Sequence, residues 1–125
     1  AMARFPGEIE AGVTIDDPLW SPDLLVACAK LAQVTLPADR EIDGVDPLPV
    51  LFGETRTVHR SFVFEYKSHA ALRMKNWKIV REASSEPWQL YDLGRDQEER
   101  RNLAGQFPET VNELVIELTR WRRSF

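Results

Sequence analysis

The end of the chain constrains the fold most strongly. From Pro108 onward, apolar side chains recur at spacings of three and four residues, at Val111, Leu114, Val115, Leu118 and Trp121. This spacing places them on one face of a helix, and Pro108 suits the first helical turn. Because a helix with one apolar face must bury that face against another element, the segments before Pro108 have to supply a partner surface.

Those segments have the alternating pattern of β-strands. In residues 61–66, three aromatic side chains occupy every second position and so share one face of a strand. Lys75-Asn76 is suited to a two-residue hairpin loop. Further strands are predicted at 70–74, 77–81 and 88–93. The sequence therefore predicts an α+β fold in residues 55–125, a small antiparallel sheet of three or four strands packed by the C-terminal helix.

The sequence of the N-terminal part predicts a helix over residues 22–34. Ser21 is expected to cap it, Pro22 suits its first turn, and Asp23 favours its positive end. Its apolar residues cover most of the circumference: Leu24, Leu25, Val26, Ala27, Cys28, Ala29, Leu31 and Ala32. Such a helix is normally buried on several sides. A chain this short has little with which to surround it, so we expect a partner, either a larger domain or a second copy of the chain.

Composition and charge exclude several classes of protein. The net charge of −4 argues against nucleic-acid binding, which requires a basic surface. No apolar run approaches the roughly 20 residues of a membrane-spanning helix. The single cysteine, Cys28, cannot form an internal disulfide. No signal peptide begins the sequence as given, so we expect a soluble protein, cytoplasmic if the chain is complete.

Several segments, in order, resemble one known family. They are Ala1–Ile9, Ser21–Pro37, Asp43–Glu54, Leu72–Val80, and Leu90-Tyr91-Asp92-Leu93 followed by Asp96, Glu99 and Asn102. Together they resemble the C-terminal end of arylsulfatase-type sulfatases of the alkaline-phosphatase-like superfamily. The chain departs from the family pattern where Val26-Ala27 replaces Pro-Thr, Gln33 replaces a glycine and Gln97 replaces a proline. The resemblance implies that residues 1–54 are an arm from the end of the catalytic domain and that 55–125 are the C-terminal subdomain.

The resemblance also implies what the chain lacks. Family members use a cysteine in Cys-x-Pro-Ser-Arg, converted to formylglycine, together with a divalent metal, usually calcium. Neither the motif nor the other catalytic segments occur here, so we expect no catalytic residue, no metal site and no cofactor in this chain. The expected function is that of a sulfatase C-terminal fragment, inactive alone, which contributes to the architecture of the cleft. The alternative is a stand-alone interaction or oligomerisation module derived from a sulfatase.

The tail motif has a structural interpretation of its own. Asp96 and Asn102 are suited to accept hydrogen bonds from backbone N–H groups of the turns that follow the last strand. Leu103 is expected to pin the turn to the core. The motif therefore routes the chain into the final helix and performs no catalysis.

The remaining reactive side chains favour structural roles. Cys28 is expected to be a small core residue of its helix. The carboxylates of Asp16, Asp17, Asp43 and Asp46 are expected in turns, because hard-metal sites need several oxygens from separate elements. Trp77, Trp88 and Trp121 are suited to core packing, with an aromatic sugar platform as the alternative.

For the two histidines and for Arg73, the sequence leaves both a structural and a functional role open. For His59 and His69, structural or solvent-facing positions are favoured, since neither has a cysteine or carboxylate at ligand spacing. The resemblance implies that the C-terminal subdomain borders the active-site cleft. His69 and Arg73 are therefore candidates for the substrate rim of an intact enzyme. The alternative for Arg73 is a strand residue paired with a neighbouring acid.

Overall fold

A computed structural model describes residues 1–54 and 58–123, and the chain divides into two compact units, Ala1–His59 and Arg60–Phe125. Each unit is described by itself. The boundary expected between residues 54 and 55 adjoins residues 55–57, which lie outside the described residues.

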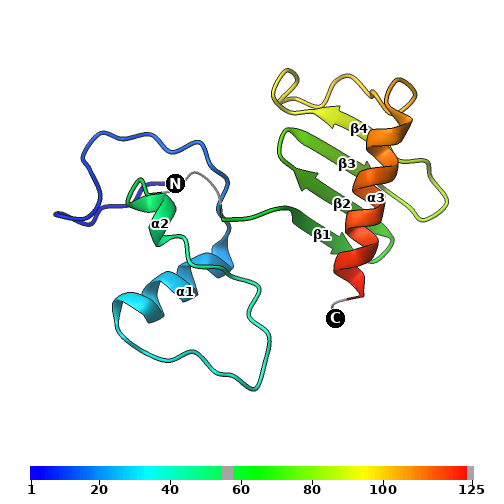
Figure 1. Ribbon diagram of the computed structural model, residues 1–125. Helices are drawn as coiled ribbons and strands as arrows, with labels where there is room; N and C mark the ends of the chain where they lie inside the picture. The colour runs from blue at the N-terminus through cyan, green and yellow to red at the C-terminus, as the bar shows by residue number, and fades with distance from the viewer. Residues whose placement is uncertain (55–57, 124–125) are drawn as a thin grey trace. The chain divides into compact units, whose positions relative to one another are not determined.

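The second unit contains an antiparallel sheet in the order β1-β2-β3-β4 (Figure 1). Its strands are β1 (Phe62–Tyr66), β2 (His69–Met74), β3 (Trp77–Arg81) and β4 (Gln89–Asp92). The predicted loop at Lys75-Asn76 joins β2 to β3, and Lys75 adopts a positive φ of 55°. Sequential hairpins therefore build the whole sheet.

Helix α3 (Pro108–Arg122) covers one face of this sheet (Figure 1). Leu114 and Leu118 of α3 pack against one inward-facing row of the sheet, formed by Val63, Leu72, Ile79 and Leu90. Complete burial of a leucine or isoleucine side chain stabilises the folded state by about 1.5–3 kcal/mol. The predicted α+β fold, a four-stranded antiparallel sheet with a C-terminal helix, is confirmed. The three tryptophans of this unit are partly buried against the same core: Trp77, Trp88 and Trp121.

The tail motif routes the chain from β4 to α3 through side-chain hydrogen bonds. The carboxylate of Asp96 accepts hydrogen bonds from the backbone N–H groups of Arg100 and Arg101 at 3.1 and 2.8 Å. The side-chain oxygen of Asn102 accepts from the N–H groups of Leu90 and Ala104 at 3.1 and 2.9 Å. The structural interpretation of this motif is therefore correct.

The first unit contains helix α1 (Ser21–Leu31) and the four-residue helix α2 (Leu48–Leu51). The expectation that Ser21 caps α1 is wrong, because the N-cap is Trp20 and Ser21 is already helical. Helix α1 also ends before residue 34. Gln33 takes a left-handed φ of 56°, and the N–H of Val34 donates to the carbonyl of Ala29 at 2.8 Å. This geometry is a helix C-terminus that normally selects glycine.

One side of α1 is exposed to solvent. Leu24, Leu25 and Leu31 keep 64%, 55% and 49% of their surface exposed, and Cys28 lies exposed among them. The expectation that Cys28 is a core residue is therefore wrong. Its helical position follows Leu24 by four residues, on the face that the described residues leave uncovered. Among the helices of the described residues, none is long and apolar enough to cross a membrane.

Candidate functional site

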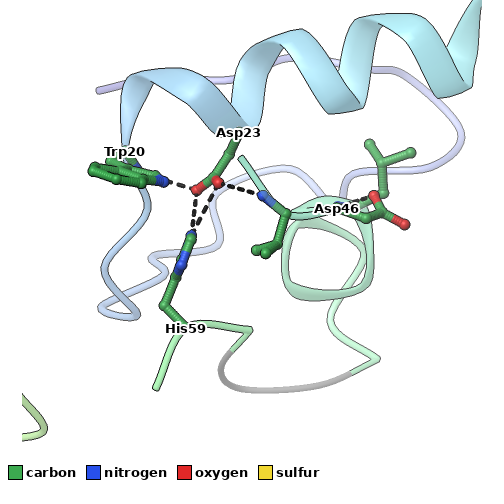
Figure 2. Close-up of polar contacts among 6 residues, drawn as sticks. Trp20, Asp23, Asp46 and His59 are labelled. Carbon is green, nitrogen blue, oxygen red and sulfur yellow. Dashed lines mark hydrogen bonds and ion pairs between the residues drawn. The ribbon is translucent and has the colours of Figure 1, made fainter. Parts of the chain in front are cut away.

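The most buried charged side chain belongs to Asp23, which is 1% exposed and lies in the first turn of α1. Figure 2 shows three groups converging on its carboxylate. The backbone N–H of Trp20 donates to Oδ2 at 3.0 Å, and the N–H of Val45 donates to Oδ1 at 3.0 Å. His59 Nε2 lies 2.9 Å from Oδ1 and 2.8 Å from Oδ2. We call these four residues the Asp23 cluster.

His59 presents Nε2, and not Nδ1, to the carboxylate. Because a carboxylate oxygen accepts hydrogen bonds, Nε2 is the ring nitrogen that is placed to donate. The indole of Trp20 meets the imidazole edge-on, with ring centroids 5.8 Å apart. The cluster therefore joins the start of α1, the loop before α2 and the last residue of the first unit.

The loop that contains Asp43-Gly44 passes so close to helix α1 that position 44 requires a glycine. A Cβ atom built on Gly44 would lie 2.2 Å from the carbonyl oxygen of Pro22, a backbone atom that cannot rotate away. Val45 then donates to Asp23, and Asp46 accepts from the N–H of Leu48 at 3.0 Å. The loop is held against the N-terminus of α1 at close range.

Asp46 anchors this loop to the other end of α1 by an ion pair with Lys30. Burial raises the pKa of the Asp46 carboxyl, but the hydrogen bonds from Lys30 and from the backbone of Leu48, with the lysine charge, outweigh it and lower the pKa overall. Asp46 is thus a structural turn residue, as the sequence indicated.

The arrangement around Asp23 is structural. A carboxylate and an imidazole perform general-base catalysis when they activate a nucleophile that is open to substrate, whereas both side chains here are more than nine-tenths buried. In the described residues, no group of three or more His, Cys, Asp or Glu side chains is placed to hold a metal ion. The donor set in this part of the chain does not fit the calcium site implied by the family.

His69 and Arg73, the candidate rim residues, both lie on β2. They share the face opposite α3, where His69 pairs with Tyr66 and Arg73 pairs with Phe62 across the β1–β2 ladder. Four residues of strand separate their Cα atoms by roughly 13 Å. Arg73 Nε donates to the carbonyl of Lys75 at 3.4 Å. No ion pair joins Arg73 to a carboxylate among residues 1–54 and 58–123, which disfavours the paired-strand interpretation.

Comparison with known proteins gives the family. The family described as "N-sulphoglucosamine sulphohydrolase, C-terminal" matches residues 1–124. The chain belongs to this sulfatase C-terminal family. It is 40% identical to human steryl-sulfatase over 76 residues, which cover 61% of this chain and 13% of that protein. It is 32% identical to canine arylsulfatase G over 123 residues, covering 92% of this chain and 23% of that protein.

Solved structures support the same relationship. A Bacteroides thetaiotaomicron protein studied for the metabolism of multiple glycosaminoglycans matches with a TM-score of 0.68 at 28% identity, over 81% of this chain and 24% of its own. The fold alone is shared with Ps i-CgsB, at a TM-score of 0.78 and 24% identity, over 94% of this chain and 27% of its own. The sulfatase C-terminal chain thus spans about a quarter or less of each of these relatives. The resemblance to the sulfatase C-terminal region is confirmed, and the sequence contains no Cys-x-Pro-Ser-Arg.

The sequence did not reveal the Asp23 cluster. From the sequence, Asp23 is predicted only to favour the positive end of its helix, and His59 only to occupy a structural or solvent-facing position. The available signal was a carboxylate at the third helical position of a segment that is otherwise apolar, since a buried carboxylate needs several donors.

Proposed function

We propose that the chain works as the C-terminal part of a sulfuric ester hydrolase, in which it shapes the substrate cleft while another part of the enzyme carries the catalytic motif. The observation that carries this proposal is the family match, which extends from the N-terminal arm to the end of α3.

The exposed face of α1 supports the same proposal. Leu24, Leu25 and Leu31 form an apolar strip on one side of α1, where each keeps 49–64% of its surface exposed. Such strips usually mark an interface. In a complete sulfatase, we propose that the catalytic part covers this strip.

His69 and Arg73 are proposed as rim residues, each acting on its own. Arg73 has no carboxylate partner among the described residues and remains free to meet an anionic group, for which a guanidinium is well suited. His69 lies exposed at the start of β2. Because they are far apart, substitutions at the two positions should have independent effects on substrate binding.

The first test is to read the coding DNA upstream of this segment. An in-frame Cys-x-Pro-Ser-Arg supports the proposal, and a reading frame that begins at Met2 contradicts it. In the second test, the purified 125-residue chain is incubated with an aryl sulfate, and no sulfate release is expected. Turnover by this chain alone would show that the catalytic group lies within it.

The rim role is tested in the enzyme made from the longer reading frame. Arg73→Ala and His69→Ala should each raise KM and leave the thermal unfolding temperature unchanged. Lys75→Ala, at an exposed turn position two residues after Arg73, is the matched control. Unchanged KM in both rim variants would remove them from the cleft.

The alternative, a stand-alone interaction or oligomerisation module, is favoured by one observation. The apolar strip on α1 is exposed in this chain by itself. If the upstream DNA lacks the catalytic motif, this second function takes the place of the first.

A further inference from the structure

Two positively charged side chains face each other across the hairpin of β2 and β3. Arg73 is paired with Lys78, one step along the ladder from the residues that close the loop at 75–76. In a hairpin with a two-residue loop, this second pair is not hydrogen-bonded, so its side chains lie at the closest cross-strand spacing, with Cβ atoms about 4.5–5.5 Å apart. Both side chains lie on the sheet face opposite α3, because Leu72 and Ile79 beside them pack under that helix.

This pair of cations has too few counter-charges in the part of the chain that the structure describes. Like charges directly opposite each other destabilise a ladder. The ammonium of Lys78 is compensated, because it lies 2.5 Å from Oε1 of Glu99. Arg73 is partly buried, its Nε donates to the carbonyl of Lys75, and its guanidinium has no carboxylate within ion-pair distance among residues 1–54 and 58–123. Two positive charges therefore share one carboxylate.

The carboxylate that compensates Lys78 comes from a residue with a strained backbone. Glu99 has a left-handed φ of 56°, a conformation that strains any residue with a Cβ and normally selects glycine. Strain of this kind persists where the surrounding structure holds the residue in place, and it gathers at ligand sites. The Glu99 oxygen uses one of the three N–H donors of the ammonium, and the Lys78 side chain keeps 27% of its surface exposed. Lys78 is thus fixed beside Arg73 with donors to spare.

We propose that Arg73 and Lys78 together bind a sulfate group, and that Glu99 is the positioning residue that fixes Lys78. The guanidinium offers a planar fork of donors and the ammonium a compact charge, and oxyanions accept hydrogen bonds from both. Because the two side chains leave neighbouring strands at the closest spacing, one anion can contact both. The bound sulfate supplies the negative charge that the described residues do not provide for Arg73.

The identity of the ligand rests on the proposed function, in which the substrate is a sulfate ester. The ester that is cleaved has to lie at the catalytic motif, which this sequence does not contain. The group at Arg73 and Lys78 is therefore a second sulfate of the same substrate, and the site selects substrates that carry more than one. A free sulfate ion has the same chemistry, so the experiment compares the two sources.

A titration of the full chain, followed by nuclear magnetic resonance, tests the site directly. Sodium sulfate replaces sodium chloride at constant ionic strength, so that screening is the same at every point. The Nε–H signal of Arg73 and the backbone amides of Arg73 and Lys78 should shift and saturate, while the amide of Leu103, bonded to Leu90, stays in place. Glucose 6-sulfate should give the same shifts, and glucose none. Shifts with inorganic sulfate alone would identify an adventitious ion only, and that result, or no saturating shift, overturns the proposal.

Four variants show whether the two cations act together. Arg73→Gln and Lys78→Gln should each weaken sulfate binding about tenfold. Lys75→Gln removes the same charge from the exposed turn and should change the affinity by less than about twofold. Glu99→Gln can still accept a hydrogen bond from Lys78 but lacks the negative charge, so it should tighten binding. Equal losses in the first three variants, or weaker binding by Glu99→Gln, overturns the proposal.

The enzyme made from the longer reading frame separates this site from the proposed function. If that frame contains the catalytic motif, Arg73→Gln should raise KM for a doubly sulfated substrate more than for its singly sulfated counterpart. An equal effect on both substrates, which a carboxylate from the rest of the protein paired with Arg73 would produce, overturns the proposal and leaves the proposed function standing. A frame without the motif removes the proposed function, and the titration still decides whether the pair binds sulfate.

Discussion

Removal of the Asp23 carboxylate should destabilise the first unit strongly. Asp23→Ala leaves three partly buried donors without their acceptor: two backbone N–H groups, from Trp20 and Val45, and the His59 Nε2–H. An unsatisfied buried donor costs about 1–3 kcal/mol, and some of this is recovered as water enters the space. We expect a total loss of about 3–5 kcal/mol, in the range measured for broken buried ion pairs.

Native-state hydrogen exchange measures this loss within each unit. The amide of Ala32 donates to the Cys28 carbonyl at the end of α1, at 2.9 Å, and reports on the first unit. Its protection should fall by about two to four powers of ten. The amide of Leu103, bonded to Leu90 in the second unit, should change little.

Two further variants test whether the loss of stability comes from the buried carboxylate of Asp23 in particular. Asp23→Asn keeps one acceptor oxygen and should lose about half as much stability. Asp16→Ala removes an exposed carboxylate from the same unit and should change stability by less than about 0.5 kcal/mol. If Asp23→Ala lowers the protection of Ala32 by less than about fivefold, the cluster does not hold the unit together and the reasoning fails.

Three other substitutions have predicted effects on the stability of the fold. Gln33→Gly should raise stability by about 1 kcal/mol, because the left-handed backbone of the residue after the C-cap strains any side chain with a Cβ; a lower unfolding midpoint in urea would contradict this. Gly44→Ala should destabilise the fold, since the new methyl overlaps the Pro22 backbone, and an unchanged midpoint would refute the close approach. The N–H groups of Arg101 and Arg100 lower the pKa of Asp96, so its contribution is complete above the unfolded carboxyl pKa of about 3.9 and disappears as pH falls through the lower folded value. Asp96→Asn should therefore flatten the acid limb of the stability curve, and an unaltered limb would argue against the role of Asp96.

Local patterns predicted most of the second unit. Strand alternation, the Lys75-Asn76 loop and the α3 stripe depend on short-range periodicity, which the sequence displays directly. The same holds for Asp96 and Asn102, whose side chains bond to backbone groups within a few residues or across one turn.

The first unit was harder to predict because its contacts are not local. Asp23 meets Val45 and His59, which lie far along the chain, and no periodic pattern links them. The sequence predicts a core position for Cys28 because apolar composition indicates burial without showing what provides it, yet Cys28 is exposed. It predicts a helix to residue 34 because glutamine, unlike glycine, gives no signal that the backbone at Gln33 is left-handed.

The contact of residues 102 and 103 with Leu90 determines where the sheet can grow. Both outward groups of Leu90 are occupied by the chain's own return loop. The backbone of Leu90 is therefore not available to an additional strand beyond β4. Loss of these two contacts would open a sheet edge of the kind that templates aggregation.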